Sequence, residues 1–205
     1  MQAQTVPVAF PAAGGVVLRG VRFAVGDRWA VLVHDEGEDL DAWRPLVGDL
    51  IGLGLCVLCF DLRGHGASDD PWQQYRAVSD VLAAFRFARA EGARRVFLLG
   101  AGAGATAALA AGGARKVEAI VLYSPRPDLD GLRPEALRLA VAPKLIFVGG
   151  LDEAAAAAAS EVLSRTIGWS VLESPPVVAQ GTQLLASDWA EHVVEHTVGF
   201  IRDYL

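Results

Sequence analysis

"LLGAGAGATAAL", residues 98–109, begins as an apolar run, passes through glycines at alternate positions and continues as an alanine-rich run. This order predicts a buried strand, a tight turn and a helix, because glycine adopts the strained backbone angles of such a turn most easily. Turns of this kind normally present a nucleophile or a phosphate at the tip. Here the tip is Gly102, which has no side chain.

The rest of the chain alternates strand-like and helix-like segments. The predicted strands cover residues 5–11, 16–25, 29–34, 55–61, 94–100, 117–124, 143–150 and 169–174. The predicted helices cover about 40–53, 77–91, the run after Gly104, the alanine run after Asp152 and about 188–204. The first two strands form an antiparallel pair. The alternation predicts one α/β domain, residues 1–205, with a mostly parallel central sheet, helices on both faces and no lid domain.

Charge and composition exclude several classes of protein. The net charge of −6 argues against nucleic acid or an anionic membrane as the main partner. Residues 96–114 are uncharged and long enough to span a membrane, but the clustered glycines divide them into strand, turn and helix. We therefore expect no membrane segment.

The N-terminal "MQAQTVPVAFPAAGG" lacks a basic region and a sustained apolar region, so we expect no signal peptide. Cys56 and Cys59 lie three apart in a strand and point to opposite faces, which prevents them from sharing a metal. Two buried, reduced thiols favour a cytoplasmic protein.

Two templates fit the glycine turn. Gly100, Gly102 and Gly104 have the frame of the nucleophile elbow G-x-S-x-G, with glycine in the serine position. Gly100, Gly102 and Ala105 also fit the dinucleotide fingerprint G-x-G-x-x-[G/A]. That fingerprint belongs in the first βαβ unit, with a carboxylate ending the next strand, and here the next strand ends Tyr123-Ser124-Pro125. Dinucleotide binding is therefore the weaker alternative, no cofactor is predicted, and a merely structural glycine turn stays open.

Four further segments match a known order of motifs. They are "AVLVHDEG" (30–37), "FDLRGHGASDD" (60–70), "PKLIFVGGLDE" (143–153) and "VVAQGTQLL" (177–185). Together with the elbow, they resemble the α/β-hydrolase superfamily, particularly its small lidless bacterial esterase-like members, over nearly the whole chain. The match to D-x-R-G-H-G-x-S in residues 61–68 is the most specific.

The resemblance implies a degenerate catalytic triad. Gly102 stands for the nucleophile, Asp152 for the acid and Gln180 for the histidine. Glycine cannot attack a carbonyl, and the glutamine amide cannot take a proton near neutral pH. In a triad enzyme, loss of the nucleophile or the histidine lowers turnover by about 10⁶. Asp152 also directly precedes a helix, so we expect it to act as an N-cap.

The resemblance also identifies the oxyanion-hole region as Asp35, Glu36 and Ala103. Asp35 follows His34 where the family has glycine, and Glu36 comes next. Carboxylates beside the hole disfavour a developing oxyanion. Even the activity that an oxyanion hole alone provides is therefore not expected.

Three other residues are candidates to line the pocket: His34, His65 and Ser124. Ser124 ends a strand near the expected site and is a candidate substitute nucleophile with His34 as its base, although no fixed spacing supports the pair. His65 belongs to the R-G-H-G loop, where an ordering role is favoured over a chemical one.

"HVVEH", residues 192–196, matches the H-x-x-E-H pattern of a class of zinc peptidases. Two histidines four apart on a helix can share a metal. The helix is amphipathic, however, with both histidines on the flank or polar side of its apolar stripe. We therefore expect surface histidines and no metal site.

The sequence thus predicts an α/β-hydrolase-fold protein that lacks serine-hydrolase catalysis and has a small-molecule binding or interaction role. The alternative is an active hydrolase on esters or related acyl substrates that uses residues not recognised above. A chromogenic ester and a serine-reactive phosphonate discriminate between the two.

Overall fold

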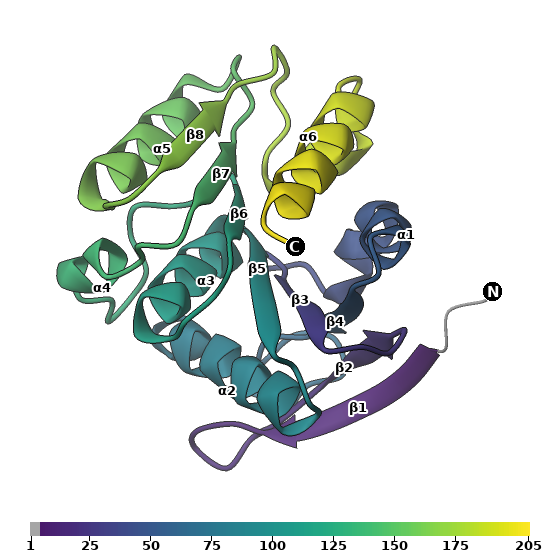
Figure 1. The fold of residues 1–205 in the computed structure, drawn as a ribbon. Coiled ribbons are helices and arrows are strands. Elements are labelled where there is room, and N and C mark those ends of the chain that lie inside the picture. The colour runs from purple at the N-terminus through teal and green to yellow at the C-terminus, as the bar shows by residue number, and fades with distance from the viewer. Residues whose placement is uncertain (1–4) are drawn as a thin grey trace.

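The computed structural model describes residues 5–205. Residues 1–4, which belong to the stretch tested for a signal peptide, lie outside the described part. Eight strands form one sheet in the order β1-β2-β4-β3-β5-β6-β7-β8 (Figure 1). The strands are β1 Thr5–Pro11, β2 Val17–Phe23, β3 Arg28–Val33, β4 Cys56–Phe60, β5 Arg95–Ala101, β6 Ile120–Tyr123, β7 Lys144–Phe147 and β8 Ser170–Glu173. β1 and β2 are antiparallel to each other and β2 to β4, and the remaining pairs are parallel. The predicted mostly parallel sheet and its opening antiparallel pair are confirmed.

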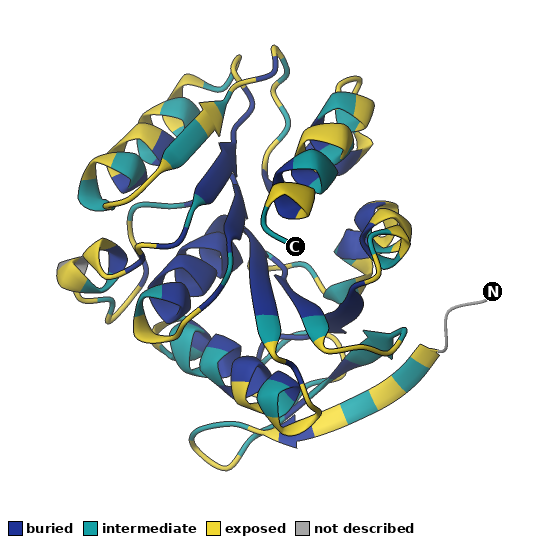
Figure 2. Cartoon of the chain, viewed as in Figure 1, coloured by how far each residue is buried: buried dark blue, intermediate teal, exposed yellow. Residues whose placement is uncertain are grey.

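Helices cover both faces of the sheet. They are α1 Arg44–Gly52, α2 Ala77–Ala90, α3 Gly102–Ala114, α4 Pro134–Arg138, α5 Glu153–Arg165 and α6 Ala190–Asp203, with short 3-10 turns η1 Leu40–Trp43, η2 Gln74–Arg76 and η3 Gly181–Ala186. Apolar residues of α2, α3, α4 and α5 pack in one core layer, and those of α1 and α6 pack in the other. The central strands β3 to β7 lie between the two layers and are largely dark blue, that is buried, in Figure 2, whereas the edge strands β1 and β8 are mostly teal and yellow.

The two cysteines show how the strand divides its side chains between these layers. Cys56 belongs to the layer under α2 and α3, and Cys59 to the layer under α1 and α6. Both are free and buried, and burial raises the pKa of the Cys56 thiol to about 11. The prediction that they point to opposite faces is confirmed.

α3 explains the uncharged run in the sequence. Its residues from Gly102 to Gly112 are all buried, because it packs against the sheet with α2 and α4 beside it (Figure 1). A helix covered on all sides needs no polar face, which is why the segment is apolar all round. Within residues 5–205, no helix has the length and apolar character needed to cross a bilayer.

The connection between β6 and β7 holds only the short helix α4, which the sequence did not predict. The 20 residues between the two strands, five of which form α4, add no lid domain. The carboxyl ends of β3, β5, β6 and β7 therefore stay open, and the residues that follow these strands form the candidate site.

Candidate active site

The glycine turn joins β5 directly to α3. Gly102 has a positive φ of 52°, the left-handed conformation that suits glycine. A Cβ added at Gly100 would meet the backbone of Ala105 at 2.6 Å, so strand and helix approach too closely there for any side chain. This is the geometry of a nucleophile elbow, in which the tip residue is exposed at the top of the sheet.

The carboxylate of Asp35 occupies the space above the tip. A Cβ added at Gly102 would overlap all three atoms of that carboxylate. Asp35 Oδ1 accepts a hydrogen bond from the N–H of Ala103 at 2.8 Å and another from the N–H of Glu36 at 2.7 Å. In α/β-hydrolases, the oxyanion hole consists of the N–H after the nucleophile and one from the loop after the third strand. Both corresponding donors here bind one carboxylate oxygen.

Arg126 holds this carboxylate from its other side. Its Nη2 donates to Asp35 Oδ2 at 3.0 Å, and its Nη1 donates to Glu36 Oε2 at 3.3 Å. Trp72 Nε1 donates to the other oxygen of Glu36 at 2.7 Å. The N-terminus of α3 adds its positive end to the same place. These donors partly compensate the negative charge at position 35.

Sequence reasoning missed Arg126. The signal was available, because Arg126 follows the end of β6 by three residues, and β6 is the neighbour of β5 in the sheet. Residues after neighbouring parallel strands meet at one edge. Only the direction in which the Arg126 side chain points could not be predicted from the sequence.

Asp152 and Gln180 are in contact, as their proposed family positions require. Asp152 is the N-cap of α5, where Oδ1 accepts from the N–H of Ala155 at 2.9 Å. Gln180 Nε2 donates to Asp152 Oδ2. These two hydrogen bonds, that from Ala155 first, lower the pKa of Asp152. The glutamine amide thus makes the contact that an imidazole N–H would make, but has no basic nitrogen to offer a nucleophile.

Ser124 follows β6 with a positive φ of 48°. It is 8% exposed, and its Oγ accepts from the N–H of Gly181 at 3.0 Å. Among the described residues, no hydrogen bond joins Ser124 to a histidine. Its contact helps to hold the segment that carries Gln180.

His34 is fully buried, and both of its ring nitrogens form hydrogen bonds with the backbone. Nε2 accepts from the N–H of Leu62 at 2.9 Å, so Nδ1 carries the proton that it donates to the carbonyl of Asp35 at 2.6 Å. Burial lowers the pKa of His34, which keeps the ring neutral. This geometry gives no support to His34 as the base for Ser124 or as a residue that faces the pocket.

His65 has the same kind of role in the neighbouring loop. Its Nε2 accepts from the N–H of Gly37, and its Nδ1 donates to the carbonyl of Arg63, both at 3.0 Å. Arg63 itself is buried against Asp80, with Nη2 to Oδ1 at 2.6 Å. These contacts order the R-G-H-G loop, and they leave no ring nitrogen of His65 for chemistry.

A small cavity of about 220 Å³ opens beside the elbow. Its lining residues are Asp35, Ser124, Pro125, Arg126, Ala154, Ala155, Ala158 and Gln180. Ser124 is the one of the three predicted pocket-lining residues that lines this cavity. His34 and His65 do not line it, because their side chains are bonded to the backbone of the neighbouring loops. The cavity is below the usual volume of a drug-sized ligand site, about 300–1,000 Å³.

The model of the Alpha/beta hydrolase family matches residues 30–201, which is most of the chain. The chain belongs to the α/β-hydrolase family. A search of curated proteins by sequence found no match. Three solved structures illustrate the likeness in fold, and each match covers nearly all of both chains.

An esterase of Pyrococcus furiosus superposes with a TM-score of 0.85 at 17% identity, over 98% of this chain and 93% of that one. The dienelactone hydrolase of Anabaena variabilis gives 0.78 at 22% identity, over 100% of both chains. The esterase domain of a Rhodothermus marinus protein gives 0.77 at 22% identity, over 98% and 99%. At these identities the likeness establishes the α/β-hydrolase fold. The chemistry at the elbow has to be argued from the residues.

Proposed function

We propose that this α/β-hydrolase has no serine-hydrolase activity, and that the carboxylate of Asp35 permanently occupies its oxyanion hole. One observation carries the proposal: Asp35 Oδ1 accepts from the N–H groups of both Ala103 and Glu36. These are the donors that would otherwise stabilise the oxyanion of an acyl-transfer reaction. The absence of a hydroxyl at Gly102 and of a base at Gln180 points the same way.

The electrostatics oppose residual catalysis as well. A substrate oxyanion would have to displace a carboxylate that also pairs with Arg126 at 3.0 Å. The arrangement resembles the bound state of an esterase, with the protein's own side chain in place of the reacting group. An exposed guanidinium contributes only modestly to such a pair. The two backbone donors lie at the start of α3 and in the loop after β3.

The wild-type protein provides the first test. We expect a short-chain p-nitrophenyl ester to be hydrolysed no faster than in buffer, and a fluorophosphonate to label no residue in intact-protein mass spectra. Stoichiometric labelling together with turnover would instead establish the alternative, an active hydrolase that uses unrecognised residues. Ser124 would then be the first residue to examine.

A reconstruction tests the assignment of the elbow. The triple variant Asp35→Gly, Gly102→Ser, Gln180→His removes the carboxylate and supplies nucleophile and base. We expect it to hydrolyse the ester about 10²-fold faster than wild type or more, since the missing groups are worth about 10⁶ in a mature triad. The matched control is Asp35→Gly, Gln180→His, which lacks only the hydroxyl. Equal rates in these two variants would contradict the assignment of Gly102 to the nucleophile position.

The cavity beside Arg126 and Gln180 supports a second, compatible role, the binding of a small polar molecule. Its lining combines the amide of Gln180 with three alanines of α5, Ala154, Ala155 and Ala158. A thermal-shift screen of small metabolites tests this role. A ligand whose shift disappears in Gln180→Ala would locate its site here.

We further propose that residues 1–205 form one cytoplasmic domain. The single continuous sheet supports one domain. The free thiols of Cys56 and Cys59 are compatible with a reducing compartment. Mild proteolysis that yields a stable fragment much shorter than the full chain would contradict the single domain.

A further inference from the structure

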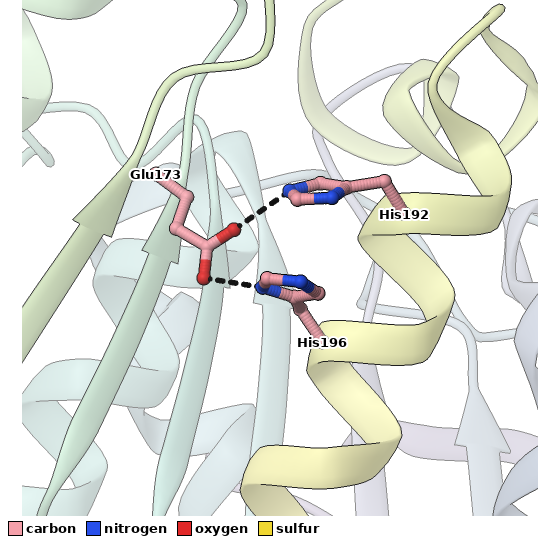
Figure 3. Close-up of side chains that lie close together, drawn as sticks. All are labelled: Glu173, His192 and His196. Atoms are coloured by element: carbon pink, nitrogen blue, oxygen red, sulfur yellow. Dashed lines mark hydrogen bonds and ion pairs between the residues drawn. The ribbon is translucent and has the colours of Figure 1, made fainter.

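Three side chains that could bind a metal meet away from the elbow. Glu173 is the last residue of the edge strand β8, and His192 and His196 lie one turn apart on α6. His192 Nε2 lies 3.0 Å from Glu173 Oε2, and His196 Nδ1 lies 2.8 Å from Glu173 Oε1. Figure 3 shows both imidazoles pointing from the helix toward the carboxylate. The two ring centroids are 3.9 Å apart.

The spacing suits a first-row divalent ion. One ligand atom from each residue lies within 4.8 Å of the others. Ligand atoms around a four-coordinate zinc ion lie about 3.3 Å apart, given bonds of about 2.0–2.1 Å. The imidazoles of His192 and His196 are 35% and 44% exposed, so small rotations can adjust these separations without disturbing the core.

The surroundings favour a cation. Glu173 and His196 line a groove of about 790 Å³, which also contains the carboxylates of Asp49, Glu191, Glu195 and Asp203. Arg202 is the one basic residue in that lining. The negative field raises the local concentration of cations, and the groove leaves room for water in a further coordination position.

We propose that Glu173, His192 and His196 form a divalent transition-metal site, with zinc as the preferred ion and a solvent-filled fourth position. The donor set of two imidazoles and one carboxylate is one that zinc accepts with a water as fourth ligand. A bound ion would connect α6 to the edge strand β8.

This proposal revises the expectation of no metal drawn from the sequence. The histidines are surface residues, as expected, but the third ligand lies 19 residues before His192 and is brought in by the packing of α6 on the sheet. Without an ion, the carboxylate accepts hydrogen bonds from both rings. In the metal-bound state, the nitrogen of each ring that faces the carboxylate would be unprotonated, and the ring would carry its proton on the other nitrogen.

Zinc titration of the tag-free, chelator-treated full chain tests the site. At about pH 7.5, where most exposed histidines are neutral, we expect one equivalent to bind with a Kd below about 100 µM in competition with a chromogenic chelator. We also expect saturating zinc to raise the Tm by about 5 °C, and magnesium to leave it unchanged.

Single substitutions of the three proposed ligands test whether these residues bind the zinc ion. Glu173→Gln, His192→Ala and His196→Ala should each weaken zinc binding at least about tenfold. Glu195→Gln is the matched control, because Glu195 lines the same groove on the same helix but is not one of the three ligands. It should keep the wild-type Kd within about twofold. Circular dichroism of each metal-free variant verifies that α6 remains folded.

A wild-type Kd weaker than about 100 µM overturns the proposal. A loss smaller than tenfold in His196→Ala overturns it as well, since binding would then not depend on this cluster. If Glu195→Gln weakens binding as much as Glu173→Gln does, the ion is held by the acidic groove in general and the assigned ligands are wrong.

Discussion

The four histidines form two pairs that behave in opposite ways. His34 and His65 lie beside the elbow, and all four of their ring nitrogens are hydrogen-bonded to the backbone. His192 and His196 lie on the last helix, and each directs one ring nitrogen at a single shared carboxylate, that of Glu173. The pair nearest to the family's catalytic motifs has both ring nitrogens of each histidine bonded to the backbone. Within residues 5–205, each histidine of the other pair has a side-chain hydrogen bond only to the Glu173 carboxylate, through one ring nitrogen.

The difference shows that position near a motif does not decide what a histidine can do. A ring nitrogen is available for proton transfer or metal binding only when no backbone group already uses it. The same reasoning applies to the glycine turn, where the N–H groups of Ala103 and Glu36 already donate to Asp35.

The largest effect on stability should come from Gly102→Ser. This variant tests whether the Asp35 carboxylate occupies the space above Gly102. The added Cβ overlaps the Asp35 carboxylate, so we expect the free energy of unfolding to fall by about 3–4 kcal/mol. Urea denaturation provides the measurement. In the background of Asp35→Gly the same substitution should be much less destabilising, because the overlap is gone. Equal losses in both backgrounds would show that Asp35 does not occupy this space.

The two histidine pairs can be compared directly by truncation. His34→Ala leaves the buried N–H of Leu62 and the carbonyl of Asp35 without partners, so we expect a loss of about 2–3 kcal/mol. His196→Ala in metal-free buffer removes a half-exposed side chain and should change stability by no more than about 0.5 kcal/mol. Similar losses in the two variants would remove the distinction between the pairs.

Acid should destabilise the protein through the buried His34. Because the pKa of His34 is lowered by burial, the unfolded chain binds a proton below about pH 6.5 that the folded chain does not. Stability should therefore fall from pH 7.5 to pH 5.5. The slope should be shallower in His34→Gln than in wild type. The neighbouring charged groups are His65, Asp61 and Glu38, which both proteins share. Parallel slopes in wild type and His34→Gln would contradict a neutral His34.

A small effect should also follow Arg126→Met. Its guanidinium pairs with Asp35 and Glu36 but is 42% exposed, so we expect a loss of about 0.5–1 kcal/mol that shrinks further at high salt. Asp35 should keep its place through the N–H groups of Ala103 and Glu36. A loss above about 2 kcal/mol would mean that Arg126, and not the backbone, holds the carboxylate in the oxyanion hole.

Much of the fold could be predicted because its signals are local. The apolar runs, the glycines at 100, 102 and 104 and the capping position of Asp152 each act within a few residues of chain. The prediction missed α4, a five-residue helix whose pattern is too short to read. The opposed cysteines were predictable for the same local reason, since side chains alternate along a strand.

The candidate sites could be predicted only in part. The replacements at Gly102 and Gln180 are visible in the motif order, and so is a carboxylate at Asp35 where the family has glycine. That this carboxylate accepts from both donors of the hole depends on the rotamer of one side chain. Arg126 and Glu173 were not identified, because each meets its partners across strands or helices far apart in the sequence.

The sequence by itself determined the order of the strands and of every helix except α4, the tight glycine turn, and the presence of a glycine at 102 and a glutamine at 180. These follow from backbone preferences and residue chemistry, which each segment carries with it. Only the tertiary structure decided that Asp35 accepts hydrogen bonds from the N–H groups of Ala103 and Glu36 and that Glu173 faces two histidines. Those contacts arise when the sheet order and the packing of α6 bring separate segments together, and no periodicity along the chain records such distances.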